Sequence, residues 1–358
     1  MLRRVAAIDC GTNSIRLLIQ DRSPDADSDR PSDEEAAINA SRPPVEEAAK
    51  RPSRNQGRAT DLVRRADVVR LGQDVDKTGQ FASEALERVF AQCRLYAELL
   101  TEHRVPGDNV RFVATSASRD VSNRQAFFDG VRSILGVTPD VVSGAEEARL
   151  SFVGATSALP TASQGGPPPA EPHLVVDLGG GSTELVLGTA APEAALSMDV
   201  GSVRLAERYF RSDPPSASEV EAARADVAAC LEVALGAVPL GEARTLIGVA
   251  GTITSITAMC LGLERYDRAA VGGAVLPVGV ILAKCAELLT MNRVQRAAIP
   301  TLQPGRVDVI SAGALVWSAV IERVVAESGG AITQVVTSEH DILDGIAASV
   351  YPAAPARR

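Results

Sequence analysis

Asp9-Cys10-Gly11-Thr12-Asn13-Ser14 and Asp177-Leu178-Gly179-Gly180-Gly181-Ser182-Thr183-Glu184 are two acidic turns that together decide the fold of this chain. Each turn follows a short run of aliphatic residues and leads into another such run, which predicts a β-hairpin around each turn. Glycine lets backbone N–H groups converge on an anion, and the turn hydroxyls add further donors. We therefore interpret the turns as two phosphate-binding loops, one in each half of the chain.

The chemistry of the turns predicts which residues bind phosphate and which bind metal. The leading aspartates, Asp9 and Asp177, are expected to hold a hydrated divalent cation, although a single aspartate is also a common turn former. Mg²⁺ suits this arrangement because it keeps most of its waters and needs only one or two carboxylates plus phosphate oxygens; Mn²⁺ is the alternative. The expected phosphate ligands are Gly11, Thr12, Asn13, Ser14, Gly179, Gly180, Gly181, Ser182 and Thr183.

Composition indicates a soluble, two-domain globular protein. The 358 residues exceed one ordinary core, 46% are hydrophobic, and no apolar run approaches the length of about 18 residues that spans a bilayer. The first residues run directly into a strand rather than a signal-peptide core, so we expect a cytoplasmic protein without a membrane partner. A net charge of −9 argues against nucleic acid as a partner. The five scattered cysteines, including Cys10, are interpreted as reduced core thiols.

Strand and helix patterns alternate along the chain, which predicts an α/β protein. An apolar stripe between residues 86 and 100 predicts a helix, and residues 110–114 and 245–250 are expected strands. Residues 22–60, rich in Pro, Ser and charged residues, are interpreted as a disordered surface insertion, with order resuming in a strand at Asp67. Residues 160–172 are expected to form a mobile loop. The recurrence of strand, acidic turn and strand in each half suggests duplication.

Three further stretches make a family resemblance specific. The two turns, with Val249-Ala250-Gly251-Thr252, resemble the phosphate and adenosine motifs of the superfamily of actin, sugar kinases and heat-shock ATPases. Residues 114–123 and 142–150 (Ala-Thr-Ser-Ala-Ser-Arg-Asp-Val-Ser-Asn and Val-Ser-Gly-Ala-Glu-Glu-Ala-Arg-Leu) are similar to those of the exopolyphosphatase/guanosine pentaphosphatase family. The match covers nearly all of the chain outside residues 22–60 and 160–172.

The resemblance implies an α/β fold of duplicated actin-like (ribonuclease H-like) type, with two domains and the active site in the cleft between them. We expect domain I to cover residues 1–150, completed by a C-terminal helix at 341–358, and domain II to cover 151–340. Longer family members carry a helical domain with a histidine–aspartate metal motif. Here the pair His340-Asp341 is interpreted as a helix start, so the chain resembles the short, two-domain members.

The resemblance also assigns roles to single residues. Glu147 matches the proposed catalytic glutamate, which activates water, and Arg119 matches an arginine on the phosphate chain, with an interdomain ion pair as its alternative. Glu184 matches a position near the metal, or else is a solvent-facing strand carboxylate. Arg16 is interpreted as a surface residue of its strand. Gly248, Gly251 and Thr252 are ambiguous. They could contact a guanine ring or a polyphosphate chain, or they could form a purely structural turn.

The activity that the resemblance implies is Mg²⁺-dependent release of orthophosphate from a terminal phosphoanhydride. The substrate is inorganic polyphosphate or, alternatively, guanosine pentaphosphate, the alarmone of the stringent response. Two further hypotheses stay open. One is a kinase of the same superfamily, although the sequence carries no sugar-kinase signature of an acceptor pocket, and the other is a non-hydrolytic alarmone sensor. The sequence leaves the oligomeric state undecided, with a homodimer as one alternative.

Overall fold

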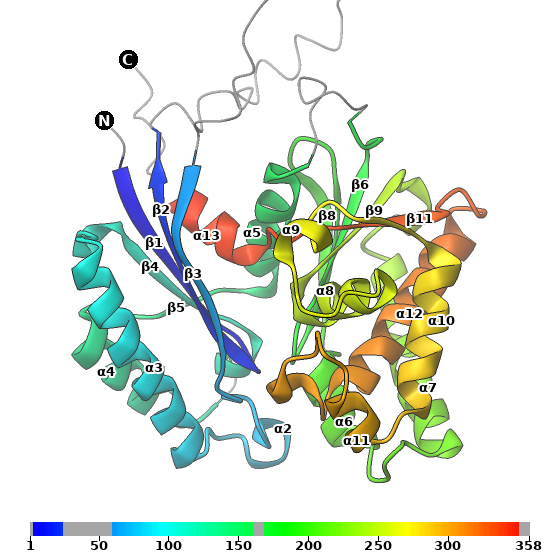
Figure 1. Cartoon of the computed structure of the whole chain (residues 1–358), viewed down its shortest axis with the longest axis horizontal. Helices are drawn as coiled ribbons and strands as arrows, with labels where there is room; N and C mark the ends of the chain where they lie inside the picture. Colours follow the sequence, from blue (N-terminus) through cyan, green and yellow to red (C-terminus); the bar gives the residue numbers. More distant parts are fainter. Residues whose placement is uncertain (1–2, 24–58, 120, 160–167, 351–358) are drawn as a thin grey trace, which may run out of the picture.

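The computed structural model describes residues 3–23, 59–119, 121–159 and 168–350. Two sheets stand side by side, each with helices on its outer face, and they form two lobes joined by a central pair of helices (Figure 1). Most of the expected insertion at 22–60 and of the expected loop at 160–172 lies outside the described residues. None of the helices in the described ranges is long and apolar enough to cross a membrane.

The first lobe has a five-stranded sheet in the order β3-β2-β1-β4-β5. Its strands are β1 (Arg3–Cys10), β2 (Ser14–Arg22), β3 (Ala59–Val68), β4 (Val110–Ala114) and β5 (Asp140–Val141). The outer face is covered by α3 (Ser83–Glu102) and α4 (Arg124–Leu135), and the short α2 (Val75–Thr78) follows β3. Side chains of β1 alternate between two cores, since Ala6, Ile8 and Cys10 face α3 and α4 whereas Val5 and Ala7 face the central helices.

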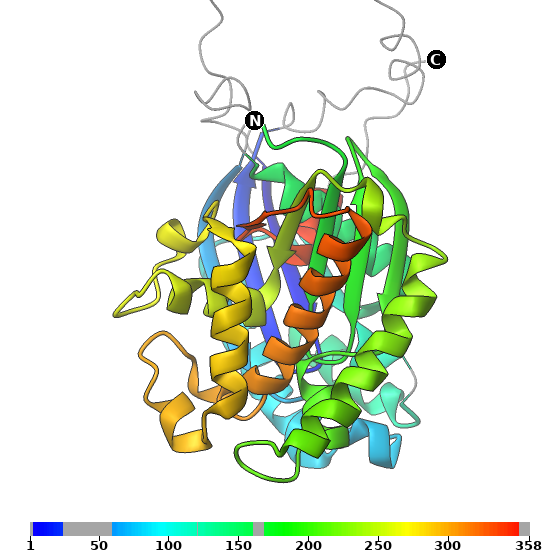
Figure 2. The same ribbon diagram turned by 90° about the vertical axis from the view of Figure 1, so that its right-hand side faces the viewer.

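The second lobe has a six-stranded sheet in the order β10-β11-β9-β6-β7-β8. Figure 2 shows three of its helices, α7, α10 and α12, over the outer face of this sheet. The strands are β6 (His173–Leu178), β7 (Thr183–Gly188), β8 (Pro192–Met198), β9 (Thr245–Val249), β10 (Val275–Pro277) and β11 (Gln334–Thr337). The helices are α6 (Ser202–Tyr209), α7 (Ala217–Leu235), α8 (Ala250–Cys260), α9 (Arg268–Val271), α10 (Val278–Thr290), α11 (Arg293–Ala297) and α12 (Ile310–Glu327).

The two sheets share one topology. Strands β8-β7-β6-β9-β11 repeat the order and the directions of β3-β2-β1-β4-β5, with two antiparallel and two parallel pairs in each lobe. The registers also match, because Asp9 lies opposite Arg16 in the first hairpin and Asp177 lies opposite Glu184 in the second. The suggestion of an internal duplication therefore agrees with the strand pairing.

Two equivalent helices pack against each other between the lobes. The helix α5 (Gly144–Ser157) follows β5, and α13 (Ile342–Ser349) follows β11. Leu150 on α5 packs with α13 against the first sheet, whereas Phe152 packs against the second. The domain limit expected at residue 150 thus falls inside a helix that contacts both lobes. Asp341 caps α13 through the amide of Leu343, as expected for a helix start at this position.

The close approach of α5 and α13 depends on glycine. A Cβ on Gly154 would overlap the carbonyl oxygen of Asp341, and a Cβ on Gly345 would overlap that of Leu150. We predict that Gly154→Ala lowers the free energy of unfolding by about 1–3 kcal/mol, because the helices must move apart. Gly279→Ala is the matched control: this glycine in α10 has no neighbouring atom in the way, so alanine should stabilise the helix slightly. Denaturant unfolding of both variants measures the difference, and equal effects would contradict the prediction.

Three strands differ from the sequence-based expectation, and the shortest of them, β10, was not expected. The strand expected from Asp67 begins at Ala59, because the charged segment before Asp67 pairs with β2 as the exposed edge of the sheet. The strand β8 was not expected, since its Ala- and Glu-containing sequence has weak strand propensity. All three are edge strands, where hydrogen bonding to a neighbouring strand matters more than an apolar sequence pattern.

Candidate active site

The two acidic turns meet across the cleft between the lobes. A Cβ on Gly181 of the second turn would lie 2.5 Å from Thr12 Oγ1 of the first turn and 2.8 Å from Ser116 Oγ. A Cβ on Gly180 would lie 3.1 Å from Thr12 Cβ. The turns therefore contact each other through glycine, and any side chain at Gly181 would push the lobes apart.

Each turn is fixed by its own backbone. The amide of Gly11 donates to the carbonyl of Ser14 at 2.9 Å, and the amide of Gly179 donates to the carbonyl of Ser182 at 3.0 Å. The N-terminus of α6 holds the second turn further, since the amide of Val203 donates to the carbonyl of Gly180 at 2.8 Å. These bonds orient both loops toward the same cleft.

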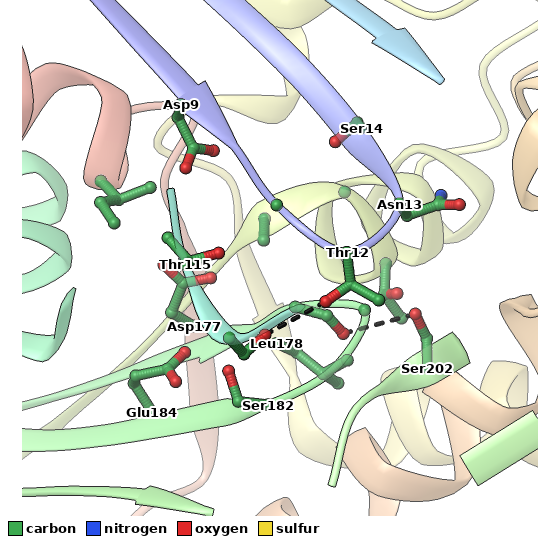
Figure 3. Close-up of a pocket in the computed structure, with 18 of the residues that line it drawn as sticks. Asp9, Thr12, Asn13, Ser14, Thr115, Asp177, Leu178, Ser182, Glu184 and Ser202 are labelled. Atoms are coloured by element: carbon green, nitrogen blue, oxygen red, sulfur yellow. Dashed lines mark hydrogen bonds between the residues drawn. The ribbon is translucent and has the colours of Figure 1, made fainter. Parts of the chain in front are cut away.

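Four carboxylates from both lobes line this cleft: Asp9, Glu147, Asp177 and Glu184. Figure 3 shows Asp9 on β1 opposite Asp177 and Glu184 of the second lobe, with Thr12 and Ser182 beside them. All four are buried, with at most 7% of their surface exposed. Such a concentration of buried negative charge needs cations or protons to balance it.

Specific partners hold three of these carboxylates. Asp9 Oδ2 accepts hydrogen bonds from Arg16 Nε at 2.8 Å and Nη2 at 2.6 Å, and the same arginine pairs with Asp341 at the start of α13. Ser151 on α5 donates its hydroxyl to Asp177. Ser197 Oγ donates to Glu184 Oε1 at 2.7 Å. The cleft carboxylates are thus oriented by hydroxyl and guanidinium donors.

The fourth carboxylate, Glu147, lies in the first turn of α5 and pairs with Arg119. Arg119 Nε also donates to the carbonyl of Val142 at 3.2 Å, which fixes the guanidinium between β5 and α5. The neighbouring Glu146 is more exposed and bonds Arg149 at 2.7 Å. Adjacent glutamates therefore have separate environments, and Glu147 is the one that reaches the cleft.

Burial raises the pKa of every carboxyl group in the cleft. The pKa of Asp177 rises to about 8, through burial first and then repulsion from Glu184. Burial and the charge of Glu184 raise the pKa of Glu147 well above its usual range, although Arg119 acts against them. Burial also raises the pKa of Asp9 and of Glu184, opposed by Arg16 and Ser197 respectively. The cluster is therefore suited to bind a cation.

The carboxylate oxygens of the cleft fit a Mg²⁺ ion whose remaining ligands are water and the phosphate oxygens of a substrate. Asp9 Oδ1 is a buried oxygen without a hydrogen-bond partner, so it keeps a free ligand position. Among the described residues, no three Asp, Glu, His or Cys side chains come together as a ready-made metal site. Mg²⁺ needs no such cage, since one or two carboxylates with waters and phosphate oxygens complete its shell.

The raised pKa values lead to a prediction about metal binding and stability. A carboxyl group with a folded pKa of about 8 and an unfolded pKa of 3.8 binds more protons when folded, so its contribution to stability falls as pH rises between these values. At about pH 6 a bound Mg²⁺ must displace that proton, which weakens its apparent affinity by about 50-fold relative to pH 8. We therefore expect MgCl₂ to raise the melting temperature more at about pH 8 than at pH 6. Thermal denaturation measures both shifts, and a larger shift at the lower pH would contradict the prediction.

Most of the expected site residues line the cleft, and a few do not. Thr183 donates its hydroxyl to the carbonyl of Val200 at 2.6 Å, and Gly248 is packed in β9 against Ile253 and Trp317. Arg119 reaches the cleft through Glu147 rather than as part of its wall. The expected residues in the wall are Asp9, Gly11, Thr12, Asn13, Ser14, Glu147, Asp177, Gly179, Gly180, Ser182, Glu184, Gly251 and Thr252.

The interpretation of Arg16 as a surface residue was wrong. Its side chain is 18% exposed and lies inside the cleft, because its strand is covered on both faces. Although burial lowers the pKa of Arg16, Asp341 and Asp9 raise it more strongly, so the residue stays charged. The spacing held a signal: Arg16 follows Asp9 by the same interval as Glu184 follows Asp177. Arg306 is a second cation in the wall that sequence reasoning missed.

The fold and the cleft define an actin-like protein of two domains, the fold of the Ppx/GppA crystal structures. The chain belongs to the Ppx/GppA phosphatase family, whose model matches residues 52–349. It is 45% identical to exopolyphosphatase 2 of Mycobacterium tuberculosis, covering 98% of this chain and 99% of that protein. The crystal structure of an exopolyphosphatase-like protein is 42% identical with a TM-score of 0.84, covering 97% of both chains. A family member from Aquifex aeolicus is 24% identical with a TM-score of 0.70, covering 98% of both chains.

Proposed function

We propose that the protein is an exopolyphosphatase, a hydrolase that removes the terminal phosphate of inorganic polyphosphate as orthophosphate. The observation that carries this proposal is the convergence of both phosphate turns and the buried Glu147 on one cleft. Full-length similarity to a protein named exopolyphosphatase 2 supports the same assignment.

In the proposed reaction Glu147 accepts the proton of a water that attacks the terminal phosphorus. The new bond joins the water oxygen to phosphorus, and the bridging P–O bond breaks, so the shortened chain leaves with the electron pair. The raised pKa of Glu147 makes its carboxylate a stronger base. Arg119 holds the carboxylate in place through their ion pair.

The other cleft residues bind the phosphates. Thr12, Ser14 and Ser182 offer hydroxyls, and the glycines of both turns let the backbone approach the anion. Asp9 and Asp177 would hold Mg²⁺, which neutralises phosphate charge and polarises the terminal group when it is bound. No acceptor other than water is required.

Guanosine pentaphosphate is the second candidate substrate, because it presents the same terminal anhydride. One observation favours a nucleotide: Gly251 and Thr252 open α8 at the cleft, and Tyr266 lies in the groove beside them. With either substrate, the proposal places the protein in the cytoplasm, with a homodimer as one alternative for its oligomeric state.

The function is tested by measuring orthophosphate release with MgCl₂ from tripolyphosphate, long polyphosphate and guanosine pentaphosphate in parallel. We expect a higher kcat/KM for a polyphosphate than for the nucleotide, and no need for an acceptor. Higher efficiency on guanosine pentaphosphate would favour the alternative. Phosphate transfer that requires an added metabolite would point to a kinase, and tight binding without release would point to a sensor.

A further inference from the structure

A groove continues from the catalytic cleft along β3. It shares Arg16, Ala250, Gly251 and Arg306 with the cleft, so the two spaces are connected. The first lobe contributes the arginines of β3 to one wall, and the second lobe contributes the segment that leads into α9 to the other. The side chains in these walls beyond the cleft include Arg64, Arg65, Tyr266 and Arg268.

The groove is lined with positive charge in a protein that is acidic as a whole. Five arginines line it, but only two carboxylates do, Glu339 and Asp341. The chain carries a net charge of −9, so this excess of arginine is local. A groove of this charge that opens onto a phosphate-binding cleft is suited to an extended polyanion.

Arg306 stands where the cleft becomes the groove. Its guanidinium lies against Gly251, where a Cβ would overlap it, and donates to Ser255 Oγ at 3.1 Å. No carboxylate among the described residues lies within ion-pair distance of Arg306. Burial lowers its pKa, and the more distant Tyr266 and Glu339 only partly oppose this effect. An anion at this junction would supply the missing partner.

Farther out, the groove offers arginines with weak existing partners. Arg65 is 43% exposed and has one ion pair, to Asp67 at 3.2 Å. Arg268 is 37% exposed; it pairs with Glu339 at 3.1 Å and with Asp61 at 3.4 Å, and it donates to the backbone carbonyl of Glu339 at 2.9 Å. Exposed ion pairs of this kind contribute little stability, so phosphate oxygens can replace them at small cost. Arg64 differs, because it is held by the buried Asp344.

A second groove leaves the cleft beside Asn13, and its charge is closer to balanced. Five cations line it, together with three carboxylates: Arg70, Lys77, Arg211, Arg293 and Arg296 with Glu207, Asp213 and Asp308. Arg70 and Arg293 both pair with Asp308, at 3.0 and 2.7 Å. Arg296 is occupied by Asp213 and by two backbone carbonyls. The walls of this groove hold three carboxylates and several apolar side chains, including Phe210. It suits a phosphate chain less well than the groove along β3.

We propose that the trailing phosphates of a long polyphosphate leave the cleft past Arg306 and run along Arg65 and Arg268. This inference rests on the proposed exopolyphosphatase function and adds the path of the chain. Both lobes contribute to the path, so a bound chain bridges β3 and α9. A chain as short as tripolyphosphate stays within the cleft and does not depend on Arg65 or Arg268.

The test compares two double variants, and each variant removes one arginine from the first lobe and one from the second. Arg65→Ala with Arg268→Ala disrupts the groove along β3, and Arg70→Ala with Arg293→Ala is the matched control in the other groove. We expect the first variant to lose about tenfold or more in kcat/KM on long polyphosphate, mainly through KM, since each lost contact is a charge-assisted hydrogen bond. Its efficiency on tripolyphosphate should be unchanged, and the KM for long chains should respond less to added salt.

Three results would overturn the inference. One is an equal loss on short and long substrates, another is unchanged activity on both, and the third is a loss specific to long chains in the control variant. If the unaltered enzyme releases no phosphate from any substrate, the proposed function has failed instead. In that case calorimetric titration with long polyphosphate still tests the groove, because weaker binding by the first variant alone supports it and equal binding by both variants refutes it.

Discussion

Glu147→Gln is expected to lower kcat for phosphate release by about 10²–10⁴-fold while KM changes little. Glutamine has the shape of glutamate and its carbonyl oxygen still accepts a hydrogen bond from Arg119, but it cannot take a proton from water. The phosphate turns are untouched, so substrate binding should persist. Steady-state kinetics on tripolyphosphate measures both parameters.

The matched control is Glu146→Gln, one residue earlier on the same helix. Glu146 pairs with Arg149 and lies outside the cleft wall, so its replacement should leave kcat within about twofold. The stability of Glu147→Gln should equal or exceed that of the unaltered protein, because the buried carboxylate has a raised pKa and is costly to ionise. Near-normal turnover in Glu147→Gln would remove Glu147 from the proposed role.

The hairpins and their phosphate turns were predictable because their signals are local. Aliphatic runs on both sides of a glycine turn define a hairpin within a few residues, and β1, β2, β6 and β7 all appear where the pattern indicates. The edge strands β3 and β8 were harder to predict. Many of their residues are exposed, so the apolar pattern is weak. Each becomes a strand because it hydrogen-bonds to a neighbouring strand, β2 for β3 and β7 for β8.

Within the cleft, the sequence indicated residue types better than it indicated partners. Asp9 and Asp177 were expected to act together, and the matched topology of the two sheets brings them to one cleft. The pairing of Arg119 with Glu147 depends on how the turn after β4 meets the first turn of α5, which no local pattern encodes. Arg16 was misread because alternation predicts the face of a strand but not whether a second helix layer, here α13, covers that face.

Asp177→Asn is the second replacement with a large expected effect. Asparagine keeps the volume of Asp177 and can still accept the hydroxyl of Ser151, but it removes one charge from the site that would hold Mg²⁺. We expect kcat/KM at fixed MgCl₂ to fall by at least about 100-fold, because loss of a direct ligand should exceed the 10–100-fold effect typical of groups that only support ligands. The MgCl₂ concentration for half-maximal activity should rise.

That shift in metal dependence separates Asp177 from Glu147. Removal of the base in Glu147→Gln should leave the half-maximal MgCl₂ concentration nearly unchanged, whereas Asp177→Asn should change it strongly. Asp199→Asn serves as the control, since Asp199 is an exposed carboxylate that pairs with Arg204 outside the cleft. Because the carboxylates share one buried cluster, Asp177→Asn should also lower the pKa of Glu147 by removing a neighbouring negative charge. The pH dependence of kcat should therefore move to lower pH in this variant, and a move to higher pH would contradict the assignment of Asp177 to the shared cluster.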